Sequence, residues 1–343
     1  MYLFENDATG KRIVAALKEA ALRKVEIYVL LDGLGSLSFP DELLKDLKFS
    51  GINIRFFAPL FSTYTFYLGR RLHRKVVVAD AKVALVGGIN IADKYHGSTT
   101  EKPWLDYAVQ LNGEIAKPLQ QLCRDKYFKK RELKNTKIKS TFQIQNDTSV
   151  RILQNDWLKG KNEICDGYIK SIRQAKKEII IIGSYFLPGI RIIQALKKAS
   201  KNKVTIKLIL SGKSDLPMTR RATCFLYDKL LKYNIELYEW DQSVLHGKVA
   251  VIDENWSTIG SFNLNNLSSY GSLEMNVEIR SRSFSSEFRT HLNGVISQCQ
   301  SITKESLKTK TTIMTKFINL ISYIITRMIE LVVTYTPYKR FYN

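Results

Sequence analysis

Residues 245–253 read LHGKVAVID, and the same pattern occurs at residues 72–80 as LHRKVVVAD. A segment that contains glycine and ends in asparagine follows each copy, as IGSFN at residues 259–263 and as VGGIN at residues 86–90. The histidine, lysine, aspartate, first glycine and asparagine of one copy all stand 173 residues from their counterparts, for example 246 against 73. Five such residues in one register indicate an internal duplication, so the chain consists of two related halves.

The flanks of both copies predict an α/β fold. In the second half the apolar run EIIIIGS is followed by the helical RIIQALKKASKNK and then by the strand-like VTIKLIL. The first half repeats the helix and the next strand more loosely, as KRIVAALKEAALRK and VEIYVLLDGLGS. Long apolar runs are typical of strands buried on both faces, and alternation of strand and helix is typical of α/β proteins.

One segment of the second half has no counterpart in the first. Residues 149–179, SVRILQNDWLKGKNEICDGYIKSIRQAKKEI, predict a strand and an amphipathic helix, whereas the chain starts at Met1, just ahead of the matching position. We expect either that the first half has lost this unit or that the sequence is truncated at its N-terminus. A truncated first half would leave a sheet edge and an apolar surface uncovered.

The charge of the chain favours a polyanionic partner. Lys and Arg number 53 against 32 Asp and Glu, a formal net charge of +21, which suits nucleic acid or an anionic membrane surface. The segment 124–139 carries eight Lys and Arg but two Asp and Glu, and predicts a solvated linker or a basic contact patch. Four scattered cysteines without metal-ligand spacing argue against a disulfide scaffold and a cysteine-based zinc site.

The C-terminal stretch 312–336, TIMTKFINLISYIITRMIELVVTYT, predicts an amphipathic helix. Its polar residues recur mostly at intervals of three or four and form one stripe beside a wide apolar face. Lys316, Arg327 and Glu330 disfavour a bilayer-spanning helix. We expect a helix that lies in a membrane interface, with a terminal helix packed on the protein core and a spanning helix as the alternatives.

The repeated motif suits phosphoryl chemistry. His73 and Lys75, like His246 and Lys248, are two residues apart, so on a strand both side chains of a pair reach one site. If the halves meet about a pseudo-twofold axis, one imidazole can attack phosphorus while the other transfers protons to and from the alcohols. This requires opposite protonation states, and we expect a nearby carboxylate to raise the pKa of one histidine.

Other residues of the motif complete this candidate site. The lysines and the amides of Asn90 and Asn263 would hold the phosphoryl oxygens, with Ser261 as a further phosphate-binding residue. Asp80 and Asp253 complete the repeated motif and are counted with its catalytic set, although their place at the far end of each strand favours a structural part. We expect no metal and no other cofactor.

The duplicated HxKxxxxD pattern, with its trailing glycine and asparagine, resembles the phospholipase D superfamily over nearly the whole chain. Finer features are similar to bacterial cardiolipin synthases without N-terminal transmembrane helices, including the segments WLD at 104–106, GKSD at 212–215 and LEMN at 273–276. The resemblance implies a duplicated α/β/α sandwich with mixed sheets, and metal-independent phosphatidyl transfer through a phosphohistidine, for which we take His73. It also implies that Asp106 and Glu274 orient the two histidines.

The resemblance implies cardiolipin synthesis from two phosphatidylglycerol molecules, with release of glycerol. The alternatives are a phospholipase D that forms phosphatidic acid and a nuclease of the same superfamily. We expect an anionic phospholipid membrane as partner and no nucleic acid, with the protein peripheral on the cytoplasmic face of a bacterial membrane. The expected divisions are the first half at 1–125, a basic linker at 126–147, the second half at 148–305 and the amphipathic helix within 306–343.

Overall fold

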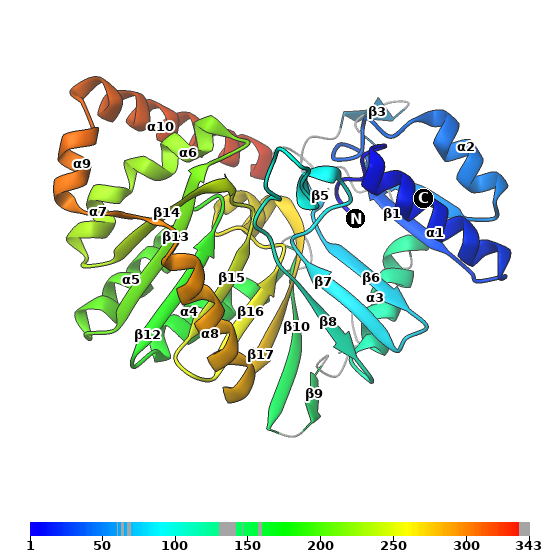
Figure 1. The fold of residues 1–343 in the computed structure, drawn as a ribbon, viewed down its shortest axis with the longest axis horizontal. Helices are drawn as coiled ribbons and strands as arrows, with labels where there is room; N and C mark the ends of the chain where they lie inside the picture. Colours follow the sequence, from blue (N-terminus) through cyan, green and yellow to red (C-terminus); the bar gives the residue numbers. More distant parts are fainter. Residues whose placement is uncertain are drawn as a thin grey trace.

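Two α/β units lie side by side, and a long C-terminal helix runs along the larger one (Figure 1). This computed structural model describes residues 1–59, 61–62, 65–66, 70–129, 142–145, 147–156 and 160–335. The α/β fold predicted from the apolar runs is confirmed. Most of the expected basic linker lies outside the described residues.

The second half is built on one mixed sheet. Its main path runs in the order β11-β10-β17-β16-β15-β12-β13-β14-β18, with β9 paired to β10. Strands β12, β13 and β14 are parallel, and β15 joins β12 antiparallel. The strands are β9 (Phe142–Gln145), β10 (Thr148–Asp156), β11 (Lys161–Asn162), β12 (Glu178–Gly183), β13 (Thr205–Lys213), β14 (Glu236–Val244), β15 (Lys248–Ile252), β16 (Trp256–Gly260), β17 (Ser272–Arg280) and β18 (Gln300–Ile302).

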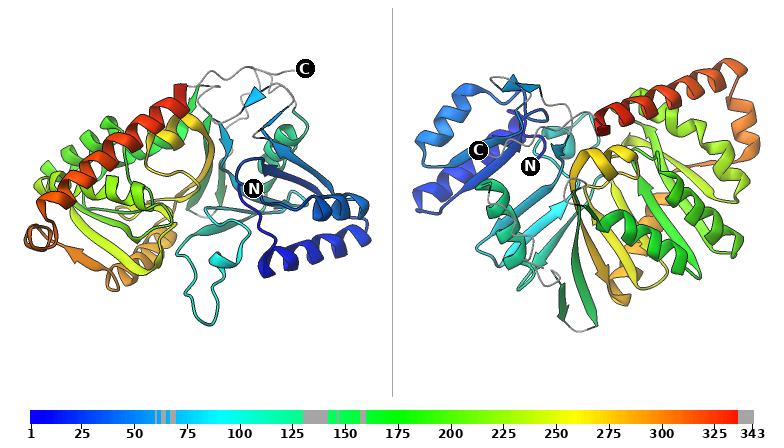
Figure 2. Two further views of the ribbon diagram at one scale, coloured as in Figure 1. Left: turned by 90° about the horizontal axis from the view of Figure 1, so that it is seen from above. Right: turned by 180° about the vertical axis from the view of Figure 1, so that it is seen from behind.

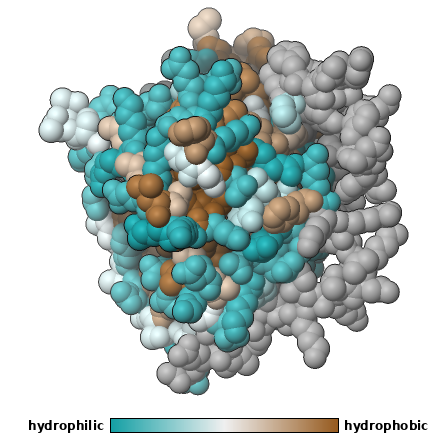
Figure 3. All heavy atoms as spheres, turned by 90° about the vertical axis from the view of Figure 1, so that its right-hand side faces the viewer, coloured by the Kyte–Doolittle hydropathy of each residue, from teal (hydrophilic) through white to brown (hydrophobic). Residues whose placement is uncertain are grey.

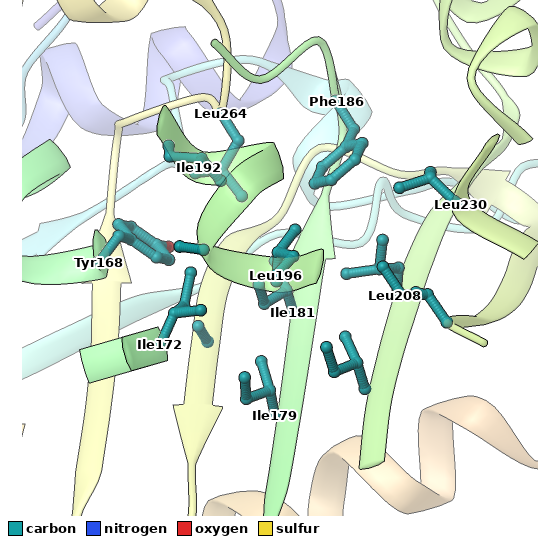
Figure 4. Close-up of a cluster of buried hydrophobic side chains, with 14 of the residues drawn as sticks. Tyr168, Ile172, Ile179, Ile181, Phe186, Ile192, Leu196, Leu208, Leu230 and Leu264 are labelled. Atoms are coloured by element: carbon teal, nitrogen blue, oxygen red, sulfur yellow. The ribbon is translucent and has the colours of Figure 1, made fainter. Parts of the chain in front are cut away.

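Helices cover both faces of this sheet. They are α4 (Glu163–Gln174), α5 (Ile190–Lys201), α6 (Pro217–Phe225), α7 (Tyr227–Lys232), the π-helical turn η3 (Leu267–Gly271), α8 (Arg282–Ile296), α9 (Lys304–Lys310) and α10 (Ile313–Tyr335). Ile179 and Ile181 of β12 point into the core beneath α4 and α5, shown in Figure 4. Ile180 and Ile182 point into the opposite core, which includes Phe288 of α8. Burial on both faces explains the uninterrupted apolar run of this strand.

From α1 onward the first half follows the element order that the second half has from α5 onward, but its sheet is in two pieces. Strands β1 and β2 form a parallel pair, and β6, β7 and β8 form an antiparallel meander. The elements are α1 (Ala8–Leu22), β1 (Tyr28–Asp32), α2 (Asp41–Phe49), β2 (Asn53–Phe57), β3 (Phe61–Ser62), β4 (Thr65–Phe66), β5 (Arg71–Leu72), β6 (Lys75–Ala79), β7 (Val83–Gly87), the 3₁₀ turn η1 (Asp93–Tyr95), β8 (Ala108–Asn112) and α3 (Ala116–Tyr127).

The split has a simple origin in the strand order. In the second half β12 lies between β13 and β15, whereas no described strand lies between their counterparts β1 and β6. Val77 and Leu85 of the meander are 51% and 44% exposed, while Ala250, the counterpart of Val77, is fully buried. Figure 3 shows this end of the molecule, where apolar patches lie between hydrophilic side chains.

Two matching contacts join the halves. Strand β5 pairs in parallel with β17, which sets Leu72 beside Leu273, and an isolated parallel bridge sets Leu105 beside Leu245. A shared core, which includes Val86 of β7 and Val277 of β17, lies under these contacts. The halves therefore meet along the segments that precede the two motif histidines.

Helix α10 packs along α6 and η3, and the two views of Figure 2 show it extended across the second half. By length and composition it is the one described helix that could cross a membrane, with a mean hydropathy of 1.6 over an 18-residue window within residues 313–334. Its polar stripe, including Asn319, Thr326 and Glu330, is buried against the protein. Its apolar side chains, such as Phe317 and Met328, are about 60% exposed. The helix thus combines contact with its own protein and an uncovered apolar face.

Candidate active site

The two motif histidines meet at the junction of the halves, and each one binds a carboxylate from the opposite half. The Nδ1 atom of His73 lies 2.9 Å from Glu274 Oε2, and Nδ1 of His246 lies 2.6 Å from Asp106 Oδ2. The backbone explains this exchange. The pairing of β5 with β17 aligns His73 with Glu274, and the Leu105–Leu245 bridge aligns His246 with Asp106. With Nδ1 bound to a carboxylate, Nε2 of each imidazole is left as the reactive nitrogen.

The motif lysines are the first residues of β6 and β15, and both are almost completely buried. Lys75 Nζ donates to the carbonyl oxygen of His73 at 2.7 Å, and Lys248 Nζ donates to that of His246. Burial lowers the pKa of Lys75 to about 7 and that of Lys248 to about 8, although Glu274 and Asp106 counteract it. The charges of both carboxylates raise the pKa of each lysine, so the four groups belong to one site.

The pKa values of the two histidines differ from the expected ones. Burial lowers the pKa of both imidazoles and that of His246 to about 4, despite the carboxylate at each Nδ1. The buried lysines act in the same direction as burial. The expected upward shift of one histidine is therefore wrong for the free site, because desolvation and two neighbouring ammonium groups outweigh a single carboxylate.

Glu274 accepts hydrogen bonds from two serine hydroxyls in addition to its contact with the histidine. Ser268 donates to Oε1 at 2.8 Å, and Ser261 donates to Oε2 at 2.5 Å. Burial raises the pKa of Glu274, but His73, Lys75 and the hydrogen bond from Ser261 outweigh it and lower the pKa overall. The hydroxyl of Ser261, expected to bind phosphate, donates to Glu274 in this structure, so its part in phosphate binding stays a prediction. Asp106 has no such serine, since Gly88 stands at the position of Ser261 and a Cβ there would clash with the Asp106 carboxylate.

The two asparagines flank the site with their amides partly engaged. Asn90 accepts from the backbone N–H of Leu3 at 3.2 Å and donates to the hydroxyl of Tyr95 at 2.7 Å. Asn263 accepts from Ser184 Oγ at 3.1 Å. Because each amide nitrogen carries two hydrogens, these contacts leave donor capacity that could meet an anion.

Asp80 and Asp253 lie at the far ends of their strands and do not join the cluster. Asp253 accepts from the backbone N–H groups of Lys176, Lys177 and Glu178 at 2.8–3.0 Å, and so fixes the entry to β12. Asp80 is exposed in the first half, where no described strand occupies that place. A strand of five residues separates each aspartate from its histidine, which favours a structural part, and the catalytic role of the two aspartates stays a prediction.

Sequence reasoning missed the aromatic rings around the histidines. Tyr2 meets the edge of His73 with ring centroids 5.0 Å apart, and Tyr185 lies 6.0 Å from His246. Tyr95 and Trp104 also contact His246, at 5.6 and 5.8 Å. The repeat held only a partial signal, because YLF at residues 2–4 stands against SYF at residues 184–186 and the two tyrosines are one position out of register. His246 is thus the more enclosed histidine, with a side chain 7% exposed against 15% for His73.

The charged groups of the site are suited to a phosphodiester. Two lysines, two amides and two imidazoles converge, and groups of three or more metal-ligating side chains are absent from the residues that the structure describes. Arg220 donates to the carbonyl oxygen of Ser211 and pairs with Glu239 at 3.2 Å, so its guanidinium is engaged within the protein. The geometry defines a two-histidine phosphoryl-transfer site between duplicated halves.

Comparison with known proteins agrees with this class. Residues 1–123 and 168–296 match a family model described as cardiolipin synthase, PLD-like domain, and the chain belongs to this family. It is 36% identical over 319 residues to cardiolipin synthase B of Escherichia coli strain K12, covering 90% of this chain and 77% of that protein. It is 30% identical over 318 residues to the minor cardiolipin synthase ClsB of Bacillus subtilis strain 168, with the same two coverages.

Solved structures share the fold at low sequence identity. Phosphatidylserine synthase from Haemophilus influenzae Rd KW20 superposes with a TM-score of 0.74 at 14% identity, covering 97% of this chain and 89% of that one. Polyphosphate kinase from Porphyromonas gingivalis gives a TM-score of 0.61 at 16% identity, covering 97% of this chain and 48% of that one. The duplicated phospholipase D-like fold is thereby confirmed.

Proposed function

We propose that the protein is a cardiolipin synthase that transfers a phosphatidyl group from one phosphatidylglycerol to another and releases glycerol. The observation that carries the proposal is the crossed pairing of His73 with Glu274 and of His246 with Asp106, between two buried lysines. Two relatives that are at least 30% identical over most of this chain are named cardiolipin synthases, which supports the substrate class.

In the first step, Nε2 of His73 attacks the phosphorus atom of phosphatidylglycerol. A phosphorus–nitrogen bond forms while the bond from phosphorus to the glycerol headgroup oxygen breaks, and His246 donates a proton to that oxygen. In the second step, His246 takes the proton from a headgroup hydroxyl of a second phosphatidylglycerol. That oxygen displaces His73 and forms cardiolipin, so atoms and protons balance over the cycle.

The assignment of His73 as nucleophile is supported by access and anchoring. Its side chain is about twice as exposed as that of His246, and its partner Glu274 is fixed by two serine hydroxyls. His246, enclosed by three aromatic rings, is the better shielded proton carrier. Shielding limits exchange of the His246 proton with bulk water before that proton is transferred.

Substrate binding supplies the protonation that the free site lacks. Burial is the main cause of the low pKa of both imidazoles, and the charge of the two lysines adds to it; a phosphodiester anion between Lys75 and Lys248 neutralises this second contribution. The anion thereby favours protonation of His246, which the first step requires. Lys75, Lys248 and the amides of Asn90 and Asn263 then stabilise the negative charge of the transition state.

We further propose that the protein binds peripherally to the cytoplasmic face of a bacterial membrane through α10. Apolar residues along one face of this helix are 37–89% exposed, and the polar opposite face is held by the protein. The net charge of +21 favours an anionic bilayer over a neutral surface or a second copy of this equally basic chain. Leu216 and Met218 of the neighbouring α6 region are also exposed, which extends the apolar surface.

The transfer reaction is tested by mass spectrometry of lipids after incubation of the full chain with phosphatidylglycerol vesicles. We expect cardiolipin and free glycerol from the wild type, and neither from His73→Ala or His246→Ala. Phosphatidic acid as the main lipid product would instead indicate a phospholipase D. Turnover in either histidine variant would overturn the two-histidine mechanism.

The membrane surface is tested by co-sedimentation with the same vesicles. Replacing the exposed Phe317 and Met328 of α10 by Glu should weaken vesicle binding at least tenfold, because two apolar anchors become charged. Phe49, which is 96% exposed at the end of α2, provides a matched control, and Phe49→Glu should bind like the wild type. Equal binding of all variants, or a change of oligomeric state only, would refute docking through α10.

A further inference from the structure

The buried face of α10 carries polar groups where a packed helix normally carries apolar ones. Asn319, Ser322, Thr326 and Glu330 are 4–8% exposed, and this face lies against α6 and η3. A carboxylate is seldom buried without a specific partner, since its desolvation is costly. The surroundings of Glu330 therefore need an explanation beyond helix packing.

Arg327 and Glu330 attach α10 to two segments that lead into the active site. Arg327 donates to the carbonyl oxygens of Leu187 and Pro188 at 3.0 and 2.8 Å, and it pairs with Glu330 at 2.9 Å. The Glu330 carboxyl also meets the backbone N–H groups of Asn266 and Leu267, where η3 begins. A buried ion pair contributes little more to stability than a well-packed apolar pair, so its geometry is better explained by what it fixes.

The turn η3, which Glu330 contacts, donates a hydrogen bond from a serine hydroxyl to the carboxylate that binds the nucleophilic histidine. Ser268, next to Leu267 in η3, donates to Glu274 Oε1 at 2.8 Å, and the other oxygen of Glu274 binds His73. The π-helical conformation of η3 is uncommon and is often retained at functional sites. A contiguous set of contacts therefore runs from α10 through one turn to His73.

We propose that Glu330 is a positioning residue for His73, and that it acts through η3, Ser268 and Glu274. Docking of α10 on an anionic lipid surface fixes Glu330 against η3 and so holds the nucleophile in its reactive orientation. This inference rests on the proposed function for its lipid surface and its assay. Energetic coupling along such a path is established only by double-mutant analysis, which determines the experiment.

The experiment measures kcat on phosphatidylglycerol vesicles for Glu330→Gln, Ser268→Ala and the double variant. Each single change should lower kcat about tenfold with KM and vesicle binding unchanged. The double variant should also be about tenfold slower, because both changes interrupt one path. Glu305→Gln, the same change at an exposed site on α9, should match the wild type. A hundredfold loss in the double variant would show that Glu330 does not act through Ser268.

Two further readouts separate positioning from stability and from the proposed reaction. The imidazole NMR signal of His73, assigned among the four histidines of the chain with His73→Ala, should move in Glu330→Gln while that of His246 stays. This signal needs no turnover, so it tests the inference even if cardiolipin is not the product. If only the melting temperature or vesicle binding changed, and the His73 signal did not, Glu330 would be structural and the proposal would be refuted.

Discussion

Replacing Lys75 by Met should stabilise the protein while it destroys the active site. The folded state keeps this lysine almost fully buried and lowers its pKa from 10.5 to about 7. At about 1.4 kcal/mol for each pH unit, retaining the charged lysine costs the fold about 5 kcal/mol below pH 7. Methionine has a similar length and no charge, so it relieves this cost. It also leaves the carbonyl of His73 without its lysine donor, a loss of about 1–3 kcal/mol.

The effect has a definite pH dependence. A lysine whose folded pKa is lowered destabilises the fold fully below that pKa, and the destabilisation disappears as pH rises toward 10.5. The stability gain from Lys75→Met should therefore be about 2–4 kcal/mol at pH 6.5 and smaller by about 3 kcal/mol at pH 9.5. The hydrogen bond that is lost is common to both conditions, so the difference between them depends only on the lysine charge.

Urea titrations of wild type and Lys75→Met at the two pH values measure this difference. The same samples should show at least a hundredfold loss of phosphatidyl transfer. A gain that does not change with pH would mean that packing, not charge, causes the stabilisation. A loss of stability at pH 6.5 would refute the inference that Lys75 is charged at a cost to the fold.

Three further outcomes follow from the site. The value of kcat/KM should fall as pH rises from 7 to 9, because Lys75 and Lys248 lose their protons near pH 7 and 8 and hold phosphate less well; a flat profile would contradict these values. Asp253→Ala should lower the free energy of unfolding by about 2–3 kcal/mol through the loss of three backbone contacts, whereas Asp80→Ala should change it by less than about 0.5 kcal/mol. Equal losses for the two aspartates in urea titrations would show that their environments are alike. When inorganic phosphate binds, the protein should take up protons, because His246 becomes charged. Calorimetry in buffers of different ionisation enthalpy would detect this proton uptake. If no protons were taken up, His246 would not be the acid.

Much of this architecture could be predicted from the sequence, because the two copies of the motif share chemically distinctive residues. The repeat predicted both His–Lys pairs, and apolar runs such as EIIIIG predicted the strands of an α/β fold. The family resemblance indicated Asp106 and Glu274, and the structure sets each of them against a motif histidine. A sequence motif of this kind specifies which residues stand at fixed spacing along one strand or loop.

The missed features depend on tertiary contacts. Ser268 lies on a π-helical turn that no short-range pattern predicts, and the contact of Ser261 with Glu274 joins two strands, so it cannot be deduced from neighbouring residues in the sequence. The pKa of His246 depends on burial, which adjacent residues do not reveal. For α10, periodicity predicts a polar stripe but does not say which side it turns to the protein, because that choice is made by α6 and η3.

The exchange of carboxylates between the halves has a consequence for how the molecule can change. Asp106 belongs to the half that carries His73, yet it serves His246, and Glu274 serves His73 in return. A half that loses its carboxylate removes the partner of the histidine in the other half, so we expect the two copies to evolve as one unit. By the same logic, a chain cut between its halves should be inert as separate pieces and regain activity only when both are mixed, since reassembly is what completes each histidine.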